Sequence, residues 1–334
     1  REKVESNILE ELQAGNYSVA ECKPAIVSAI GAVPKQDSDD IRIIHDASRP
    51  HGRSLNAFAS DLKCQYTSLD KVVDALPQGA WIGKVDLRHA YRSVPISPTN
   101  FPATGLKWKF HGSNRYVYMY DTRLPFGAKR SPAIFQDITE SIVRMMARRG
   151  YTVQVYLDDF ILIESSRVQC RKAYDTLLGL LQDLGFSISW KKCAPPTQVL
   201  VYLGVEINTV EETLSVPDEK LRQLKNDIKT WLDKSKATKR EIQSIVGKLS
   251  WASKLLRASR PFIRRLIELS CKLKRPSHKV RLSCAVKQDL QMLALICDRF
   301  NGRVYMQHSM PDHALSSDAC TTGGGSFLQG RMVL

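Results

Sequence analysis

The first two thirds of the chain mixes strand-like and helix-like patterns of apolar residues. Short apolar runs bounded by turn residues predict strands. Apolar residues spaced three and four positions apart predict helices between those strands. The order from residue 81 to 207 is strand, helix, hairpin, helix and strand, at 81–86, 131–150, 153–164, 167–184 and 199–207. This order indicates a sheet with helices on one face, which is an α+β layer.

The predicted helices carry their own start and stop signals. In the helix over 131–150, Ser131 suits the N-cap, Pro132 the first helical position and Gly150 the stop. After residue 217 the pattern is helical, and "TKRE" at 238–241 is a capping-box pattern that opens a helix. Pro261 is expected to end or kink that helix.

One strand-like segment, "VQVYLDDFILIE" at 153–164, carries two adjacent carboxylates at its centre. Like charges repel, and a carboxylate is costly to bury without compensation. Aspartate is also a common turn residue, so two β-prone runs around Asp158 and Asp159 predict a β-hairpin. Taken alone, the pair indicates no more than a tight turn.

Composition and charge narrow the choice of partner. The 334 residues suffice for two or three packed units, and 43% hydrophobic with 25% charged residues is typical of globular proteins. The net charge of +15 favours a polyanionic partner such as nucleic acid. No apolar run approaches the ~20 residues that span a bilayer, and the start lacks the apolar centre of a signal peptide. We therefore expect an intracellular protein without a membrane partner, whose oligomeric state the sequence leaves open.

The cysteines do not indicate a site. The eight are scattered without a C-x-x-C pair, at 22, 64, 170, 193, 271, 284, 297 and 320. This spacing predicts neither a zinc site nor a disulfide framework, and reduced thiols are the expectation. The chain begins with Arg1 rather than methionine, which favours a fragment or one piece of a polyprotein.

A third acidic residue, Asp86, ends an apolar strand, where its side chain can emerge from a sheet edge. If that strand lies beside the hairpin, three carboxylates converge and raise one another's pKa unless cations neutralise them. Two Mg²⁺ ions, with oxygen ligands completed by substrate phosphates, would do so. The alternative is a simple turn at Asp158 and Asp159 and a capping role for Asp86. Spacing alone leaves the two interpretations equal.

Six motifs in one order resemble those of retroelement-type reverse transcriptases. They are "RIIHDASRPHGRSLN" at 42–56, "KVDLRHAY" at 84–91, "LPFGAKRSPAIFQ" at 124–136, "YLDD" at 156–159, Gly185 followed by Lys191 and Lys192, and "VYLGVEI" at 201–207. The 124–136 segment is the most specific of them. The resemblance implies an α+β right-hand polymerase with an antiparallel-sheet palm, fingers and a helical thumb.

That resemblance also implies roles at the reaction centre. The metal-binding carboxylates would be Asp86, Asp158 and Asp159, with the backbone carbonyl of Leu87 as a further ligand for two Mg²⁺ ions or for Mn²⁺. Tyr91 would be the steric gate against a ribose 2′-OH; its alternative is a core aromatic residue. The other residues expected to hold or line the site of the incoming dNTP are Lys35, Arg42, Phe126, Gly127 and Lys191. Lys192 is the alternative to Lys191 for assisting the pyrophosphate, and a solvated lysine pair is the other alternative.

A second group of residues would contact the primer and the RNA or DNA template. These are Ser131, Pro132, Tyr156, Tyr202, Leu203, Gly204, Gln243, Gly247 and Trp251. Gly247 lies mid-helix, where glycine costs about 1 kcal/mol relative to alanine. Gln243 and Trp251 lie four residues to either side on the same helical face. Close approach to a nucleic-acid groove explains the glycine, and helix–helix packing is the alternative.

The end of the chain, "SSDACTTGGGSFLQG", resembles the first strand pair of a retroelement RNase H, with Asp318 as its first acid. A lone Asp318 cannot hold two metals, so this chain alone is expected to lack RNase H activity. The implied units are an N-terminal segment with fingers, a palm with a fingers insertion at about 97–130, thumb helices, a connection and a truncated RNase H-like start, at 1–80, 81–207, 208–275, 276–312 and 313–334.

The sequence therefore predicts an RNA-directed DNA polymerase from a retroelement, which adds dNTPs to a primer 3′-OH. Two alternatives stay open. One is a catalytically silent, domesticated nucleic-acid-binding relic, against which the three carboxylates argue. The other is a DNA-templated polymerase with a similar palm, against which the 124–136 motif argues.

Overall fold

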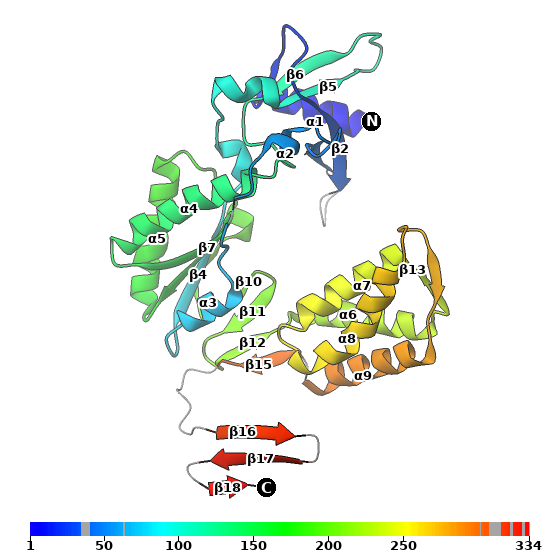
Figure 1. Ribbon diagram of the computed structural model, residues 1–334. Helices are drawn as coiled ribbons and strands as arrows, with labels where there is room; N and C mark the ends of the chain where they lie inside the picture. The colour runs from blue at the N-terminus through cyan, green and yellow to red at the C-terminus, as the bar shows by residue number, and fades with distance from the viewer. Residues whose placement is uncertain are drawn as a thin grey trace.

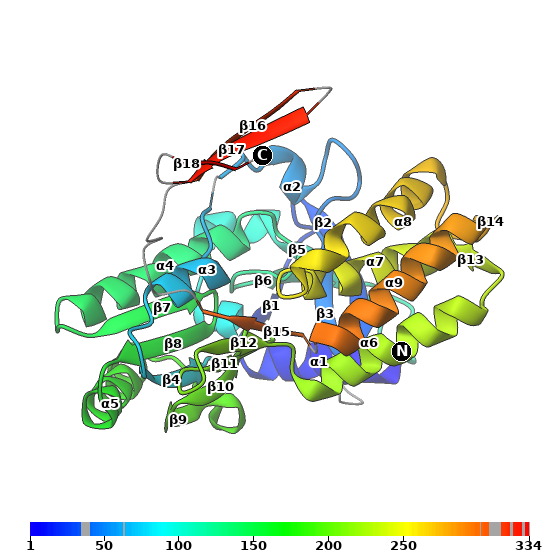
Figure 2. The same cartoon turned by 90° about the horizontal axis from the view of Figure 1, so that it is seen from below.

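The computed structural model of the chain describes residues 1–34, 41–62, 64–300, 302–306, 315–320, 323–328 and 331–333. A four-stranded antiparallel sheet, here called the palm sheet, has the strand order β7-β8-β4-β9. Its strands β4 and β7 are labelled in Figure 1, and all four are labelled in Figure 2. Its strands are β4 (Trp81–Asp86), β7 (Thr152–Tyr156), β8 (Asp159–Glu164) and β9 (Ala194–Thr197). The strand expected to end at Asp86 and the hairpin expected around 153–164 are therefore present and adjacent.

Two helices cover one face of the palm sheet. Phe135 of one helix and Leu177 of the other share a buried core with Phe160 of β8. The opposite face packs on a short helix and on a second sheet, through Ile82 and Tyr202. The helices are α4 (Ser131–Ala147) and α5 (Arg167–Asp183) on the first face and α3 (Leu69–Asp74) on the second. The central strands are thus apolar on both faces, which makes the sheet a rigid support for its edge.

The start of α4 corrects one expectation from the sequence. Ser131 is the first helical residue rather than the N-cap, and Arg130 holds the cap position. The Ser131 hydroxyl donates instead to the Pro125 carbonyl oxygen, at 2.9 Å. Ser131 therefore ties the helix to the preceding loop, which carries the 124–136 motif.

A five-stranded sheet, here called the fingers sheet, has the order β1-β6-β5-β2-β3. Its β5 and β6 pair as an antiparallel hairpin. The N-terminal helix α1, which the sequence patterns did not predict, packs on it through Ile8. The elements are α1 (Glu2–Gln13), β1 (Tyr17–Val19), β2 (Val27–Pro34), β3 (Ile41–Asp46), β5 (Gly105–Trp108) and β6 (Val117–Asp121). Along the chain, three short helices connect these strands to β4 of the palm sheet: α2 (Leu55–Phe58), η1 (Ala90–Ser93) and η2 (Pro98–Ala103).

The segment expected to be one strand over 199–207 is a hairpin. Its two-residue turn is Leu203–Gly204, and both turn residues have positive φ, +48° and +83°. That sign pattern is the one of a type I′ turn, which matches the twist of the strands it joins. The second sheet contains β10 (Val199–Tyr202), β11 (Val205–Asn208), β12 (Thr213–Ser215) and β15 (Arg303–Tyr305).

Four helices form a bundle with one core, here called the thumb bundle (Figures 1 and 2). The 238–241 capping box is confirmed, but Pro261 is the second residue of the third helix and does not end the second. The fourth helix shares the core through Leu290 and Leu293, so the bundle extends beyond the expected boundary at residue 275. The bundle contains α6 (Asp218–Asp233), α7 (Lys239–Ala252), α8 (Arg260–Lys272) and α9 (Cys284–Phe300), with η4 (Arg257–Ser259) before α8 and the pair β13 (Lys236–Thr238) and β14 (Lys279–Arg281) beside it.

The last described residues form a three-stranded antiparallel sheet. Asp318, the acid expected from the RNase H resemblance, lies on its first strand and pairs in register with Gly325. The strands are β16 (Leu315–Cys320), β17 (Gly323–Leu328) and β18 (Arg331–Val333). Within the described residues, no helix combines the length and the apolar character that crossing a membrane requires.

Candidate active site

Pairing between β4 and β8 brings the three predicted carboxylates to one edge of the palm sheet. Asp86 and Asp159 are register partners. The Leu87 N–H donates to the Asp158 carbonyl oxygen at 3.0 Å, so the backbone just beyond β4 is fixed to the hairpin turn. Asp86 is 6% exposed, and Asp158 and Asp159 are half-buried. The carboxylates are therefore close together and largely withdrawn from solvent.

The turn that presents the acids differs by one residue from the sequence prediction. The two loop residues are Leu157 and Asp158, while Asp159 already pairs with Tyr156 as the first residue of β8. Leu157 has φ +54°, and a positive φ at only the first loop position is the sign pattern of a type II′ turn. Glycine usually takes that position, so leucine there stores strain of about 1–3 kcal/mol. The surroundings must hold this turn in place.

Two buried side chains grip the hairpin from opposite faces of the sheet. From α4, Gln136 accepts a hydrogen bond from the Leu157 N–H at 2.7 Å and donates to the Val155 carbonyl oxygen at 3.2 Å. From β10, the Tyr202 hydroxyl donates to the Asp159 carbonyl oxygen at 2.9 Å. Tyr202 is fully buried, so its side chain supports the hairpin and has no surface to offer a nucleic acid.

Two lysines face the carboxylates. The Lys84 ammonium lies 3.0 Å from Asp159 Oδ1, and the Lys192 ammonium lies 3.3 Å from Asp86 Oδ1. Sequence reasoning missed Lys84, whose signal was a lysine two residues before Asp86 and on the same face of an apolar strand. It offered Lys191 or Lys192, and Lys192 is the one that reaches this site.

Burial dominates the electrostatics of the hairpin acids. It raises the pKa of Asp158 and of Asp159, and the negative charge of Asp86 raises both further. Lys84 opposes the rise in the pKa of Asp159, and Lys192 opposes it at Asp158. The site therefore carries more negative charge than its two lysines balance, and further cations would stabilise it.

The donor set fits a hard divalent cation. Oδ1 of Asp86 is buried and accepts no hydrogen bond from the described residues, although the Lys192 ammonium lies beside it. Carboxylate and carbonyl oxygens are the ligands that Mg²⁺ prefers, with the remaining positions filled by water or phosphate. Across the described ranges, no group of three His, Cys, Asp or Glu side chains forms a ready-made metal cage. The protein oxygens therefore suit a Mg²⁺ ion whose remaining ligands are water or phosphate oxygens.

A cavity of about 600 Å³ opens beside these acids. Asp86 and Asp158 line one part of it, and Arg42, Tyr91 and Phe126 line another. The ring centroids of Tyr91 and Phe126 are 5.0 Å apart, and the Arg42 guanidinium carbon lies 5.3 Å from the Phe126 centroid. Burial raises the pKa of Tyr91 to about 12, so its hydroxyl stays neutral. The cavity thus combines acids, a cation and an aromatic wall.

The 124–136 motif shapes this wall through its glycine. Gly127 has φ +110°, and a Cβ placed there would lie 2.0 Å from the His45 carbonyl oxygen. No other residue fits that contact. Ser131 is buried and Pro132 is half-buried at the second helical position. Both shape the start of α4 and are placed to support the cavity wall.

The predicted nucleic-acid residues of the second sheet and the thumb bundle meet at one contact. A Cβ placed on Gly204 would lie 3.3 Å from Cζ2 of Trp251 and 2.8 Å from the Lys220 ammonium. Lys220 in turn lies 5.0 Å above the Trp251 ring. Leu203 is half-buried beside Gly204 in the turn. The turn of the β10–β11 hairpin therefore rests on α7.

The helical strip on α7 is open. Gln243 and Gly247 are exposed, and Trp251 is half-buried. A Cβ placed on Gly247 would have nothing within 4 Å among the described residues. Packing of another helix on Gly247, the alternative explanation for this glycine, is therefore absent from the described structure.

Three predicted residues remain. Tyr156 lies at the end of β7, and its ring centroid is 5.4 Å from that of Tyr66. Lys35 lies outside the described residues. Asp318 lies in β16, far along the chain from the acids of the palm sheet.

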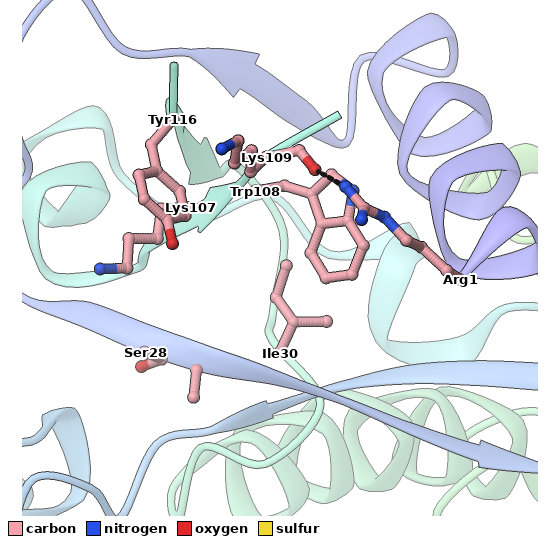
Figure 3. A pocket seen from close by; sticks show the side chains of 8 residues that line it. Arg1, Ser28, Ile30, Lys107, Trp108, Lys109 and Tyr116 are labelled. Atoms are coloured by element: carbon pink, nitrogen blue, oxygen red, sulfur yellow. Dashed lines mark hydrogen bonds between the residues drawn. The ribbon is translucent and has the colours of Figure 1, made fainter. Parts of the chain in front are cut away.

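A separate cavity of about 490 Å³ lies in the fingers sheet (Figure 3). The strands β2 and β5 pair at only two positions, Val27 with Gly105 and Ser28 with Leu106. Beyond these pairs, within the described residues, β2 is paired only with β3 and β5 only with β6, and the cavity lies where β2 and β5 separate. Its lining shares no residue with the cavity at the acids and consists of Arg1, Ser28, Ala29, Ile30, Lys107, Trp108, Lys109 and Tyr116.

Comparison with known proteins identifies the family. The family model described as reverse transcriptase (RNA-dependent DNA polymerase) matches residues 33–207, slightly more than half of the chain. This chain belongs to the reverse transcriptase family. The match contains Arg42, Asp86, the 124–136 motif and the Asp158–Asp159 hairpin. The family resemblance stated from the sequence is thereby confirmed.

Curated relatives of this reverse transcriptase chain include retroviral polyproteins. The Gag-Pol polyprotein of gibbon ape leukemia virus is 25% identical over 253 residues, which are 74% of this chain and 14% of that protein. The Gag-Pol polyprotein of walleye dermal sarcoma virus is 27% identical over 202 residues, which are 60% of this chain and 11% of that protein. The chain spans only a small part of the length of these relatives.

Solved structures confirm the fold of this reverse transcriptase chain. A foamy viral protease–reverse transcriptase in complex with double-stranded DNA matches with a TM-score of 0.74 and 19% identity, over 98% of this chain and 53% of that one. The foamy viral protease–reverse transcriptase in complex with an RNA/DNA hybrid matches with a TM-score of 0.71 and 18% identity, over 98% of this chain and 41% of that one. The α+β right-hand polymerase fold is confirmed by these matches.

Proposed function

We propose that this chain is an RNA-directed DNA polymerase domain that adds dNTPs to the 3′-OH of a primer. The observation that carries the proposal is the register of Asp86 with Asp159, which brings β4 to the hairpin turn at Asp158 beside a cavity of nucleotide size. Membership of the reverse transcriptase family supports the same reaction.

Asp86, Asp158 and the Leu87 carbonyl would hold Mg²⁺ or Mn²⁺, with Asp159 at the rim of the site. Two bound metal ions would supply charge neutralisation at the attacking and leaving oxygens of an in-line phosphoryl transfer. The protein itself contributes position. The strained Leu157 turn, gripped by Gln136, fixes Asp158 relative to the end of β4.

The cavity residues would bind the incoming dNTP. Arg42 and Lys192 carry charges suited to phosphate oxygens, and Lys192 is the member of the predicted Lys191–Lys192 pair that lines the cavity. The Tyr91 ring, held against Phe126, would leave no room for a ribose 2′-OH. Primer and template would lie across the exposed strip of α7 at Gln243 and Gly247. Foamy viral relatives in complex with double-stranded DNA and with an RNA/DNA hybrid support this choice of partner.

A primer-extension assay tests the proposal. Oligo(dT) annealed to poly(rA) should be extended with Mg²⁺ or Mn²⁺ and dTTP, and extension should fall steeply as salt increases. Asp158→Asn should lower extension at least about 100-fold, because a metal-binding charge is lost. Asp175→Asn, at an exposed ion pair on α5, is the matched control and should extend as the wild type does.

The same assay separates the alternatives. No product with any template would identify a silent relic. Extension on poly(dA) but not on poly(rA) would indicate a DNA-templated enzyme. Product that persists in Asp158→Asn would refute the metal assignment.

The domain layout is part of the proposal. The fingers would comprise residues 1–80 with the insertion at about 97–130, and the palm the remainder of 81–207. The thumb would run from 208 to 300, because α9 shares the core of the bundle. Residues 313–334, with Asp318 on β16, would be the start of an RNase H-like unit.

A further inference from the structure

A buried polar network lies at the back of the cavity beside the acids. Arg92 is 7% exposed and its Nη1 donates to both carboxylate oxygens of Asp121, at 2.7 and 2.6 Å. Its Nη2 donates to the Tyr17 hydroxyl at 3.2 Å, and its Nε faces Glu11 Oε2 at 3.4 Å. Each nitrogen of one guanidinium is therefore directed at a different segment of the chain.

His45 completes this network without adding charge. Its Nε2 lies 3.2 Å from the Tyr17 hydroxyl and 3.4 Å from Asp121 Oδ2. Burial, helped by the charge of Arg92, lowers the pKa of His45 to about 3, so the imidazole is neutral near pH 7. The charged members are Arg92, Asp121 and Glu11. They join α1, β6 and η1, while Tyr17 and His45 add β1 and β3.

The network grips Phe126 at two points. The backbone N–H of His45 donates to the Phe126 carbonyl oxygen at 2.7 Å, which fixes the backbone of Phe126. The Arg92 guanidinium carbon lies 5.7 Å from the Phe126 ring centroid, and that of Arg42 lies 5.3 Å from it. A planar guanidinium held in place by a carboxylate can orient an aromatic ring in a way that a flexible ammonium cannot.

Arg92 also helps to place Tyr91, its neighbour in the chain. Tyr91 and Arg92 belong to the single turn η1, and the Tyr91 ring lies against Phe126. Arg92, Tyr91 and Phe126 all line the cavity that contains Asp86 and Asp158. Movement of Arg92 would therefore change the wall of the cavity while leaving the acids in place.

We propose that Arg92, anchored by Asp121, is a positioning residue that holds Phe126 and Tyr91 in the geometry that binds the incoming dNTP. This inference rests on the proposed polymerase function. It adds a determinant of nucleotide affinity at the back of the cavity, where Arg92 is 7% exposed, and this determinant acts through Phe126. The chemistry at Asp86 and Asp158 does not depend on it.

Steady-state extension with the 334-residue chain separates binding from chemistry. Arg92→Lys keeps the charge beside Asp121 but loses the planar fork. We expect KM for the dNTP to rise about tenfold while kcat changes less than about threefold. The apparent Kd of the dNTP, measured with a dideoxy-terminated primer that blocks chemistry, should rise by the same factor. Lys107→Ala is the matched control, because it removes a cation 4.8 Å from the Tyr116 ring in the other cavity (Figure 3).

A double-mutant cycle tests the route through Phe126. In the Phe126→Leu background, Arg92→Lys should add less than about twofold to KM, because the ring on which Arg92 acts is gone. Full additivity, or an Arg92→Lys enzyme with wild-type KM and Kd, would overturn the inference while leaving the polymerase assignment intact. Absence of extension and of dNTP binding in the wild type would instead overturn the proposed function.

A second variant covers the case in which Arg92→Lys does not fold, as judged by thermal unfolding. Tyr17→Phe removes only the hydroxyl that accepts from Arg92 Nη2 and keeps the ring. It should raise KM for the dNTP about two- to fivefold with little change in kcat. An unchanged KM in Tyr17→Phe, with Phe126→Leu raising it, would also refute the positioning role of Arg92.

Discussion

The side-chain amide of Gln136 bonds to the backbone of the turn residue Leu157 and of Val155, two positions before it. Its oxygen accepts from the Leu157 N–H at 2.7 Å, and its nitrogen donates to the Val155 carbonyl oxygen at 3.2 Å. The last residue of the 124–136 motif thus supports the hairpin that presents Asp158. The position of the Asp158 carboxylate therefore depends on α4 as well as on the palm sheet.

Gln136→Leu should weaken both the fold and catalysis. The Leu157 N–H would lose its partner, at a cost of about 1–3 kcal/mol in the free energy of unfolding. The strained turn would relax, so kcat in primer extension should fall about 10- to 100-fold. Ser141→Ala, on the exposed face of the same helix, is the control. A Gln136→Leu enzyme with wild-type kcat would show that the turn holds its shape without the amide.

Tyr91→Ala should admit ribonucleotides. The ring lies against Phe126 with centroids 5.0 Å apart, and its removal opens space beside the sugar. The ratio of kcat/KM for dTTP to that for UTP should fall at least about tenfold. Tyr91→Phe keeps the ring and should keep the discrimination. If Tyr91→Ala discriminates as well as the wild type, Tyr91 is only a core aromatic residue.

Lys84→Met should make the protein more dependent on metal for its stability. Without the ammonium 3.0 Å away, Asp159 loses its ion-pair partner, at a cost of about 1–2 kcal/mol in the metal-free state. Bound Mg²⁺ would then restore more stability than in the wild type. The measurement is the rise in Tm on adding Mg²⁺, with Lys84→Arg as the charge-preserving control. An equal rise in all three proteins would contradict a role for Lys84 as counter-charge.

Gly247→Ala should separate stability from nucleic-acid binding. A methyl group added at Gly247 would meet no atom within 4 Å among the described residues. Since alanine favours the helix more than glycine does, the helix should gain about 1 kcal/mol in stability. The same methyl group would hinder approach of a nucleic-acid groove, so the Kd for primer–template should rise about 3- to 10-fold. Gly179→Ala, in α5 with equally open space, should stabilise without changing that Kd. Stabilisation with unchanged affinity in both variants would remove α7 from the interface.

The start of α7 should lose stability in acid. The hydrogen bond from Lys234, followed by those from Thr238, lowers the pKa of Glu241 to about 2 from its ordinary value of 4.5. A lowered pKa in the folded state stabilises above the unfolded value, and that stabilisation is lost as pH falls from about 4.5 towards 2. Glu241→Gln should therefore have a lower Tm than the wild type at pH 7, and the difference should shrink below pH 4.5. A difference that is constant from pH 7 to 3 would contradict this.

Local patterns predicted much of the site. The apolar runs around Asp158 and Asp159 and the strand before Asp86 were visible because strand periodicity and turn residues act within a few positions. Lys84 was not visible as a partner of Asp159, because their contact is a diagonal across β4 and β8 and depends on the register of distant segments. The support by Gln136 and Tyr202 was missed for the same reason.

The hairpin over 199–208 was missed for a different reason. Leu203 takes a positive φ that leucine rarely adopts, so the letters "YLGV" do not indicate a turn as strongly as an Asn-Gly pair does. The polar network around Arg92 was also hidden. Its five side chains come from five elements, and their spacing along the sequence does not predict that they contact one another.

The contact between Gly204 and Trp251 has a mechanical consequence. The β10–β11 turn leaves no room for a methyl group against the indole ring, so the hairpin and α7 cannot slide closer. Tyr202, the last residue of β10, directly precedes that turn, and its hydroxyl donates to the Asp159 carbonyl oxygen. With primer and template on α7, as proposed, a tilt of that helix would reach the turn of Asp158 and Asp159 through these two contacts. The shape of the bound duplex would then alter the position of the carboxylates, away from the surface that holds it.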